Sequence, residues 1–286
     1  MYLYNSKKLP VFSIFHFEDI SFWKNIKKSN FYSIIFTESG IGNICIDCQK
    51  RHIHHKTAVF LYPYQKVSWD FETDKIIKGI IIQFHPDFFC IDIHAKEIGC
   101  QGLLFNNPYY NTICTLESVD FIQIKGIIAQ MLQEMEQPNV ASIEMVSSLL
   151  KIILIHAVRL KLKSQTIEQI NKPAIANDIE ILISQNYLLH HDLNFYASVL
   201  NISKSTLNRK CNQIFGRSFQ KILIDKIIIE SKKKLYLSND SIKKISLEMG
   251  FEDPLYFSRF FKNNTTVSPL EFRKNIKGTF LETLSI

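Results

Sequence analysis

The chain has 286 residues, enough for two domains of ordinary size, with 46% hydrophobic residues and a formal net charge of +7. No apolar run reaches the length of a membrane span, and the N-terminal residues lack the apolar core and cleavage site of a signal peptide. The six cysteines are too scattered for a disulfide framework, so we expect a cytoplasmic protein that binds no membrane.

Four segments in the first 115 residues are rich in β-branched and aromatic residues, which is typical of strands. They are 31–37, 42–48, 57–62 and 78–85. Turn residues separate them. Short strands at this spacing predict a β-sandwich or a small β-barrel over about residues 10–115.

A cluster of potential metal ligands lies inside this β-rich region. It comprises Cys45, Cys48, His52, His54 and His55, and Cys-x-x-Cys with nearby histidines is a spacing found in zinc sites. However, the two cysteines are three positions apart in a strand pattern, so their side chains would point to opposite faces. The alternative is a mixed hairpin with exposed histidines. We therefore predict no metal and no other cofactor.

At residue 118 the apolar residues change to helical spacing. Ile124 and Ile128 share one face of a first helix, Pro138 interrupts the pattern, and Leu149 and Ile153 share one face of a second helix. We predict a helical hairpin over about 118–164. Its apolar faces would cover the barrel, pair with a second copy of the chain, or do both.

Residues 166–176 are polar and contain one proline, which predicts a linker between an N-terminal domain (1–165) and a C-terminal domain (177–276). From Lys172 onward there are 17 Lys and Arg against 11 Asp and Glu, a net charge of +6, whereas the preceding residues carry +1. Basic residues supply much of the affinity for a polyanion such as DNA. A solvated basic surface without a partner is the alternative.

The C-terminal domain contains a helix-turn-helix pattern at 241–263. Ser241 is a good N-cap for one helix, Gly250 suits a sharp turn, and Asp253 followed by Pro254 suits the start of the next. The second helix of such a unit can lie in the major groove of DNA.

An earlier pattern at 193–215 has the same organisation. Asn201 occupies the turn and Ser203 caps the second helix, whose predicted buried residues are Leu207, Cys211 and Phe215. A long helix from about 218 to 237 connects the two units. Adjacent turns of the major groove are ~34 Å apart, so helices 203–215 and 253–263 could occupy two of them.

The second pattern resembles the AraC/XylS family of bacterial transcription regulators. The matching residues are Ser241, Ile242, Ile245, Gly250, Phe251, Asp253, Tyr256, Phe257, Arg259, Phe261, Lys262, Ser268, Pro269, Phe272 and Arg273. Ser246 and Thr266 stand where the family usually has alanine and glycine. If position 266 needs a positive φ, a β-branched residue there costs on the order of 1 kcal/mol.

The resemblance implies a two-domain protein with an N-terminal cupin-like jelly roll and a C-terminal all-α domain with two helix-turn-helix motifs joined by a long helix. The N-terminal domain would sense a small-molecule effector or hold a homodimer. The expected partners are double-stranded promoter DNA and RNA polymerase, and the usual outcome in the family is activation.

Outward-facing residues of the two recognition helices are the candidate DNA contacts. Those expected to contact bases are Lys204, Ser205, Asn208 and Arg209 on the first helix and Pro254, Leu255, Tyr256, Ser258 and Arg259 on the second. Arginine pairs with guanine and asparagine with adenine, each worth ~1–3 kcal/mol of discrimination. Lys210, Lys262 and Arg273 are expected to contact phosphates, although simple solvation is the alternative for any single lysine.

No nucleophile, base and acid stand in a catalytic arrangement, and we predict that the protein is not an enzyme. The sequence predicts a sequence-specific DNA-binding transcription regulator, dimeric and an activator. Two alternatives are a metal-dependent cupin enzyme or metal sensor fused to a DNA-binding domain, and a regulator whose solid barrel serves only to oligomerise.

Overall fold

The structure is a computed structural model, and it describes residues 1–4, 10–18, 30–46, 49–65, 67–70, 77–94, 103–105, 109, 112–170 and 173–277. The chain divides into two compact units. Residues from 1–105 and 112–163 form most of the first, and residues from 164–278 form most of the second. No helix in the described ranges is long and apolar enough to cross a membrane.

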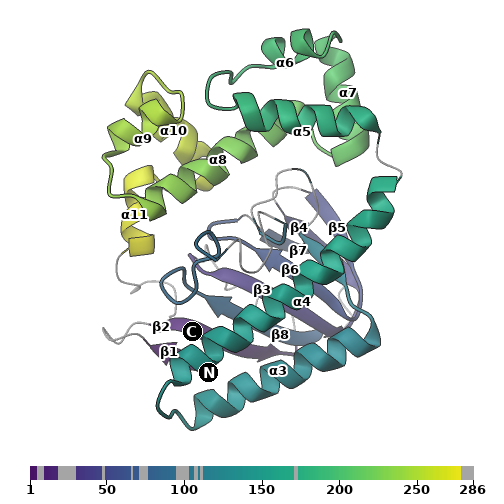
Figure 1. The fold of residues 1–286 in the computed structure, drawn as a ribbon, viewed down its shortest axis with the longest axis vertical. Coiled ribbons are helices and arrows are strands. Elements are labelled where there is room, and N and C mark those ends of the chain that lie inside the picture. The colour runs from purple at the N-terminus through teal and green to yellow at the C-terminus, as the bar shows by residue number, and fades with distance from the viewer. Residues whose placement is uncertain are drawn as a thin grey trace. The chain divides into compact units, whose positions relative to one another are not determined.

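The N-terminal unit is built on two antiparallel sheets (Figure 1). The larger sheet has the order β1 (Tyr2–Tyr4), β2 (Pro10–Phe17), β8 (Lys78–Phe84), β3 (Tyr32–Ser39), β6 (Thr57–Leu61) and β9 (Ile113–Thr115). The smaller sheet has the order β5 (Gln49–Ile53), β4 (Gly42–Ile46) and β7 (Val67–Asp70). The four predicted strands correspond to β3, β4, β6 and β8.

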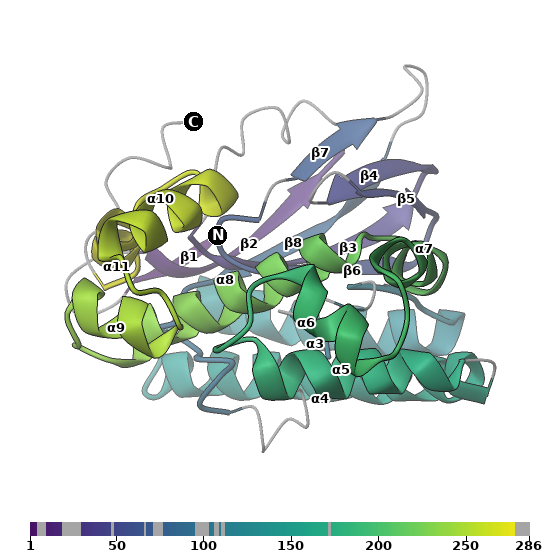
Figure 2. The ribbon, with the colours of Figure 1, turned by 90° about the horizontal axis from the view of Figure 1, so that it is seen from above.

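Alternate residues of the larger sheet enter two different cores, because successive side chains of a strand point to opposite faces. Ile35 and Ile81 pack between the two sheets against Ile44 of the smaller one. Ile34 and Ile82 enter a second core that contains residues of two long helices. The larger sheet is therefore the middle of three layers (Figure 2), which explains why its strands are apolar on both faces.

The predicted helical hairpin consists of α3 (Ser118–Glu136) and α4 (Ser142–Ile170). Ile124, Ile128, Leu149 and Ile153 are buried, and they belong to the core that the helices share with the larger sheet. The linker predicted at 166–176 is shorter than expected, because α4 continues to Ile170 and another helix begins at 174. The polar residues after 164 continue the helix.

The C-terminal unit is all-helical. Its helices are α5 (Ala174–Asn186), α6 (Leu193–Val199), α7 (Lys204–Phe215), α8 (Phe219–Leu237), α9 (Ile242–Glu248), α10 (Pro254–Thr265) and α11 (Pro269–Lys277). Helices α6 and α7 form the first helix-turn-helix, and α9 and α10 form the second. They lie toward opposite ends of the connecting helix α8 (Figure 1).

The two helix-turn-helix units repeat the same caps and turns. The N-cap side chains of Ser203 and Asp253 accept hydrogen bonds from backbone amides of α7 and α10, respectively. Asn201 and Gly250 occupy the corresponding tight turns with φ of 51° and 80°. Helix α10 begins 50 positions after α7, so the two units form an internal structural repeat.

The residue that ends each recognition helix also repeats, and here the sequence departs from the preferred chemistry. Gly216 ends α7 with φ of 66°, and Thr266 ends α10 with φ of 74°. A side chain with a branched Cβ is strained in this left-handed region. Ser246, the other departure from the family pattern, is fully buried and donates a hydrogen bond to the Lys243 carbonyl at 3.1 Å.

The turn before α6 packs against the turn of the second helix-turn-helix. His191 lies at this contact, and its Nε2 atom is buried. Burial lowers the pKa of His191 from its ordinary value of 6.5, and the neighbouring His190 lowers it further. Hydrogen bonds with the backbone of Tyr187 and Met249 raise the pKa but do not cancel the shift. The folded protein therefore favours the neutral imidazole.

We expect Thr266→Gly to stabilise the protein by about 1 kcal/mol, because it removes the strain of a β-branched residue at positive φ. Urea denaturation of the full chain, followed by circular dichroism, measures the change. Asn201→Gly is the matched control and should be close to neutral, because asparagine tolerates the left-handed region. An unchanged or lower midpoint for Thr266→Gly would contradict the prediction.

We expect the stability contribution of His191 to be complete above its ordinary pKa of 6.5 and to be lost as the pH falls below it. Below that value the unfolded state binds a proton that the folded imidazole resists, so unfolding is favoured down to the lowered pKa of the folded state. Denaturation midpoints of the wild type and His191→Gln between about pH 7.5 and 5 test this. The variant should show the shallower decline, and parallel curves would exclude the effect.

Candidate DNA-binding surface

Helix α7 buries one face and exposes the opposite one. Leu207, Cys211 and Phe215 are buried as predicted, and burial raises the pKa of the Cys211 thiol to about 12. The first-turn residues Lys204 and Ser205 and, one turn later, Arg209 are exposed, whereas Lys210 is half-buried. The exposed side of α7 therefore presents a cation, a hydroxyl and a guanidinium in succession.

Asn208 has a structural role that the sequence did not suggest. It is half-buried, and its Oδ1 accepts a hydrogen bond from the backbone amide of Phe219 at 3.1 Å. That amide belongs to the first turn of α8 and has no partner within its helix. Asn208 therefore fixes the middle of α7 to the start of α8.

The exposed face of α7 continues instead through Asn212 and Gln213, which sequence analysis missed. Both are exposed. Counting seven and eight positions from Ser205 along the helix places them on the same face as Ser205 and Arg209. That spacing was the available signal, and it favours Asn212 over Asn208 as the outward-facing amide.

Helix α10 exposes a face of different chemistry. The exposed fractions are 70% for Leu255 and 58% for Tyr256, and 74% for the side chain of Arg259. The Arg259 Nη2 lies 4.0 Å from an Asp253 carboxylate oxygen, a long, exposed contact that contributes little energy. Lys262 is also exposed, so two cations and two largely apolar side chains share the surface.

Two other candidates on α10 have less freedom to contact a ligand. Pro254 and Ser258 are half-buried, and the Ser258 hydroxyl donates to the Pro254 carbonyl at 2.8 Å. Phe257 and Phe261 are fully buried. These two aromatic residues therefore form core rather than a stacking platform, whereas Phe260 is half-buried and Tyr256 is exposed.

Arg273 lies on α11 and contacts the end of the connecting helix. Its Nε donates to the Leu235 carbonyl at 3.2 Å, and its Nη2 is buried. Leu235 is within the last turn of α8, where backbone carbonyls lack partners in their own helix. An arginine here also interacts favourably with the C-terminal end of the helix dipole. This contact ties α11 to α8.

A buried ion cluster holds the turn after α7 against α8. The Asp225 carboxylate contacts the Arg217 Nη1 and the Lys221 Nζ, both at 2.7 Å. The Asp225 side chain is only 9% exposed, so the loss of a cation would leave a buried carboxylate with weaker compensation. The cluster therefore fixes the geometry between the first recognition helix and α8.

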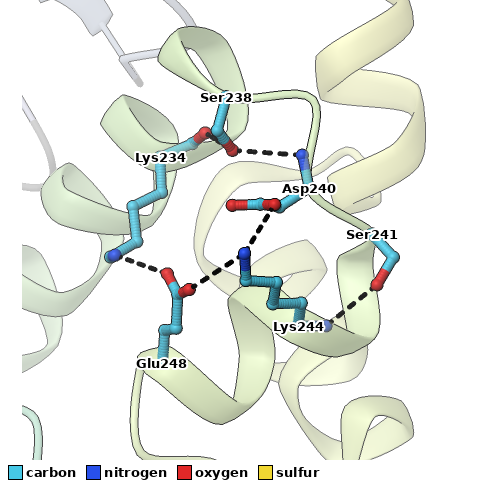
Figure 3. A network of polar contacts seen from close by, with 6 residues as sticks. All are labelled: Lys234, Ser238, Asp240, Ser241, Lys244 and Glu248. Carbon is cyan, nitrogen blue, oxygen red and sulfur yellow. Dashed lines mark hydrogen bonds and ion pairs between the residues drawn. The ribbon is translucent and has the colours of Figure 1, made fainter.

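A second, more exposed network ties α9 to α8 (Figure 3). The Lys234 Nζ of α8 contacts the Glu248 carboxylate of α9 at 2.6 Å. Lys244 contacts Asp240 at 2.8 Å and Glu248 at 3.9 Å, and its hydrogen bond to Asp240 lowers the pKa of that carboxyl. Exposed pairs add little to stability, but Glu248 of α9 contacts both Lys234 of α8 and Lys244 of its own helix.

The described candidate metal ligands of the N-terminal unit lie at the surface or near it. His52, His54 and His55 are exposed and Cys45 is half-buried, while Cys48 lies outside the described residues. The His52 Nδ1 lies 3.0 Å from Asn43 Oδ1, and its ring is 4.5 Å from that of His54. Within the described ranges, no group of three or more His, Cys, Asp or Glu could hold a metal ion.

Comparison with known proteins places the helical unit in a recognised class. Residues 196–275 match the family described as a helix-turn-helix domain, a range that begins in α6 and ends in α11. Among solved structures, that of ToxT from Vibrio cholerae O395 is similar to the chain, with 16% sequence identity. It covers 94% of this chain and 98% of that one, with a TM-score of 0.41.

Curated relatives carry the similarity further. The HTH-type transcriptional activator RhaS of Enterobacter sp. (strain 638) is 22% identical over 86% of each chain. The arabinose operon regulatory protein of Salmonella typhimurium (strain LT2) is 36% identical over 84 residues, 29% of this chain and 30% of that protein. Together with the paired helix-turn-helix units, these similarities support the predicted resemblance to DNA-binding transcription regulators of the AraC/XylS family.

Proposed function

We propose that α7 and α10 enter successive major grooves of promoter DNA. The observation that carries this proposal is the match between the two exposed faces. Ser205 and Arg209 of α7 correspond, 50 positions on, to Leu255 and Arg259 of α10, and all four are exposed. The unit that contains them carries the positive excess of the chain, which favours binding to phosphates.

The exposed residues would divide their work between bases and phosphates. Arg209 and Asn212 suit bidentate pairing with guanine and adenine, respectively, and Arg259 suits guanine. Leu255 and Tyr256 would contact thymine methyl groups. Lys204, Lys210 and Lys262 would meet phosphates. Asn208 and Arg273 would position α7 and α11 through their contacts with α8 rather than bind DNA.

We further propose that the bound protein activates transcription through contact with RNA polymerase. Support comes from the relatives, since RhaS is named a transcriptional activator. The exposed Glu248 network on α9 leaves acidic and basic groups beside the second recognition helix, where a protein partner could reach them. Transcription in vitro from a bound promoter would test this role directly.

The N-terminal unit would act as a cupin-like sensor and dimerisation domain. The face of the larger sheet that packs on the smaller one is mainly apolar, but it also buries polar side chains on neighbouring strands, among them Ser13, Ser33 and Gln83. The Gln83 Nε2 donates to the Ser33 Oγ at 3.1 Å, and both residues are buried. They share the inward face of Ile35 and Ile81, where they could anchor the polar part of a small effector.

The outer face of α3 is the proposed surface for dimerisation. Val119 and Ile122 are exposed by 75% and 69%, respectively, and Gln123, Gly126 and Gln130 continue the exposed face without a charge. An uncharged face can pack on a second copy of itself across a two-fold axis, as a C2 dimer requires. Such a dimer would present two DNA-binding units to repeated half-sites.

We expect Arg209→Ala to weaken binding to the cognate promoter by ~10–100-fold, because a bidentate pair with guanine is worth ~1–3 kcal/mol of discrimination. Fluorescence anisotropy with promoter and random duplexes measures the effect. The loss on random duplex should be much smaller. The control, Arg159→Ala, removes an exposed arginine from α4 and should change neither affinity. Equal losses on both duplexes would reduce Arg209 to a phosphate contact.

We expect Ile122→Glu to dissociate the dimer, because it places a carboxylate in an uncharged contact that two-fold symmetry would bring near its own copy. Sedimentation velocity should show a monomer at concentrations where the wild type is dimeric. Val140→Glu is the matched control, since Val140 is 93% exposed near the tip of the hairpin. A dimer that survives in Ile122→Glu would move the interface elsewhere.

A further inference from the structure

Besides α8, a second connection links the two helix-turn-helix units. It runs through the turn between α5 and α6, which directly precedes the first of them. Gly250, in the turn between α9 and α10, has φ of 80° and faces the backbone of the turn between α5 and α6. A Cβ added to Gly250 would overlap the carbonyl oxygen of Leu188 and lie 3.2 Å from His191 Nε2. Only a residue without a side chain permits so close an approach.

The contact is extended by aromatic packing. The ring of His191 lies 4.7 Å from that of Phe251, which follows Gly250 and is almost fully buried. The Phe251 ring packs in turn against Phe257 and Phe260, at 5.2 and 5.1 Å. Both partners belong to α10, so His191 reaches the second recognition helix through one intervening side chain.

On its other side His191 is fixed to the start of the first helix-turn-helix. It directly precedes Asp192, the N-cap of α6, whose side chain accepts hydrogen bonds from two amides of that helix. The backbone carbonyl of the preceding residue, His190, accepts a hydrogen bond from the Tyr196 hydroxyl at 2.8 Å. Tyr196 lies on α6 and is fully buried. The position of His191 is therefore set by α6.

The contacts with α8 hold each helix-turn-helix separately, near opposite ends of that helix. A further contact between the two closes a ring, which restricts how one can twist or bend relative to the other. We propose that the contact of His191 with Gly250 and Phe251, here called the brace, fixes the spacing and rotation of α7 relative to α10. His191 is then a positioning residue for DNA recognition. This inference rests on the proposed binding to two successive grooves.

The brace predicts a dependence on the spacing of half-sites. A one-base-pair insertion between them moves one half-site by about a tenth of a helical turn, which a rigid pair of helices cannot follow. If the brace is lost, only a fraction of molecules holds the correct arrangement, and affinity falls by that fraction. Protein that lacks the brace should also lose less affinity than the wild type when the spacing between the half-sites is changed. A variant that merely lowered the amount of folded protein would weaken binding to both DNAs equally.

The experiment uses the full chain. Operators selected from randomised DNA by the wild type are compared with versions carrying the one-base-pair insertion. We expect His191→Ala to lose about tenfold in affinity for the selected operator and to bind the inserted one with little change. The ratio of the two affinities would therefore fall by about the same factor. Phe251→Leu, which keeps an apolar side chain but removes the ring, should act alike if His191→Ala folds poorly.

Two controls bracket the interpretation. His190→Ala removes the adjacent histidine, whose ring stacks on Phe195 of α6 at 3.6 Å, and it should keep the wild-type ratio. His191→Phe restores a ring against Phe251 and should recover the ratio. If His191→Ala and Phe251→Leu both keep the wild-type ratio, the brace does not position the helices. A wild type that selects only single half-sites would instead overturn the proposed two-groove binding itself, and the inference with it.

Discussion

Helix α8 is the constraint on which the rest of the C-terminal unit depends, because both helix-turn-helix units pack against it. Near its start Phe219 packs on Tyr196 of the first unit at 4.8 Å, and near its end the Leu235 carbonyl binds Arg273. A helix of 19 residues is about 28 Å long. That length is of the same order as the ~34 Å between adjacent major-groove turns, so the connection itself suits two-groove binding.

The same constraint explains the charged residues inside α8. A helix that is covered on several sides loses the simple division into an apolar and a polar face, and some of its polar side chains become buried. The buried carboxylate of Asp225 is compensated by two cations, Arg217 and Lys221. Lys232 is also buried, and its ammonium lies 5.9 Å from the centre of the Phe272 ring of α11. These contacts link the connecting helix to its neighbours through charge as well as through apolar packing.

Local signals in the sequence predicted most of the helical unit. The caps Ser203 and Asp253 and the buried faces of α7 and α10 depend on residues within one or two turns of each other, so spacing alone was sufficient. The linker was predicted too long because polar composition does not distinguish a loop from a polar segment of helix. Strand β5 was missed for a related reason, since QKRHI is mostly polar and its exposed residues hide the alternation.

Other features depend on contacts between distant segments, which local spacing cannot pair. An outward-facing Asn208 was a reasonable expectation from its neighbour Leu207, but the amide of Phe219 captures its side chain. Gly250 was predicted as a turn residue because glycine readily adopts a positive φ. Its second role, close approach to Leu188, becomes visible only when the two turns are placed together.

The chemistry of the two exposed faces implies an unequal division of recognition, if both helices enter grooves as proposed. The face of α7 offers a hydroxyl, a guanidinium and an amide in Ser205, Arg209 and Asn212, all able to hydrogen-bond base edges. At matching positions α10 offers Leu255, Arg259 and Lys262, of which only Arg259 can form a bidentate pair. Apolar and phosphate contacts add affinity with less discrimination. The half-site contacted by α7 should therefore carry most of the sequence specificity. The half-site contacted by α10 should mainly add affinity and fix the register of the protein on the DNA.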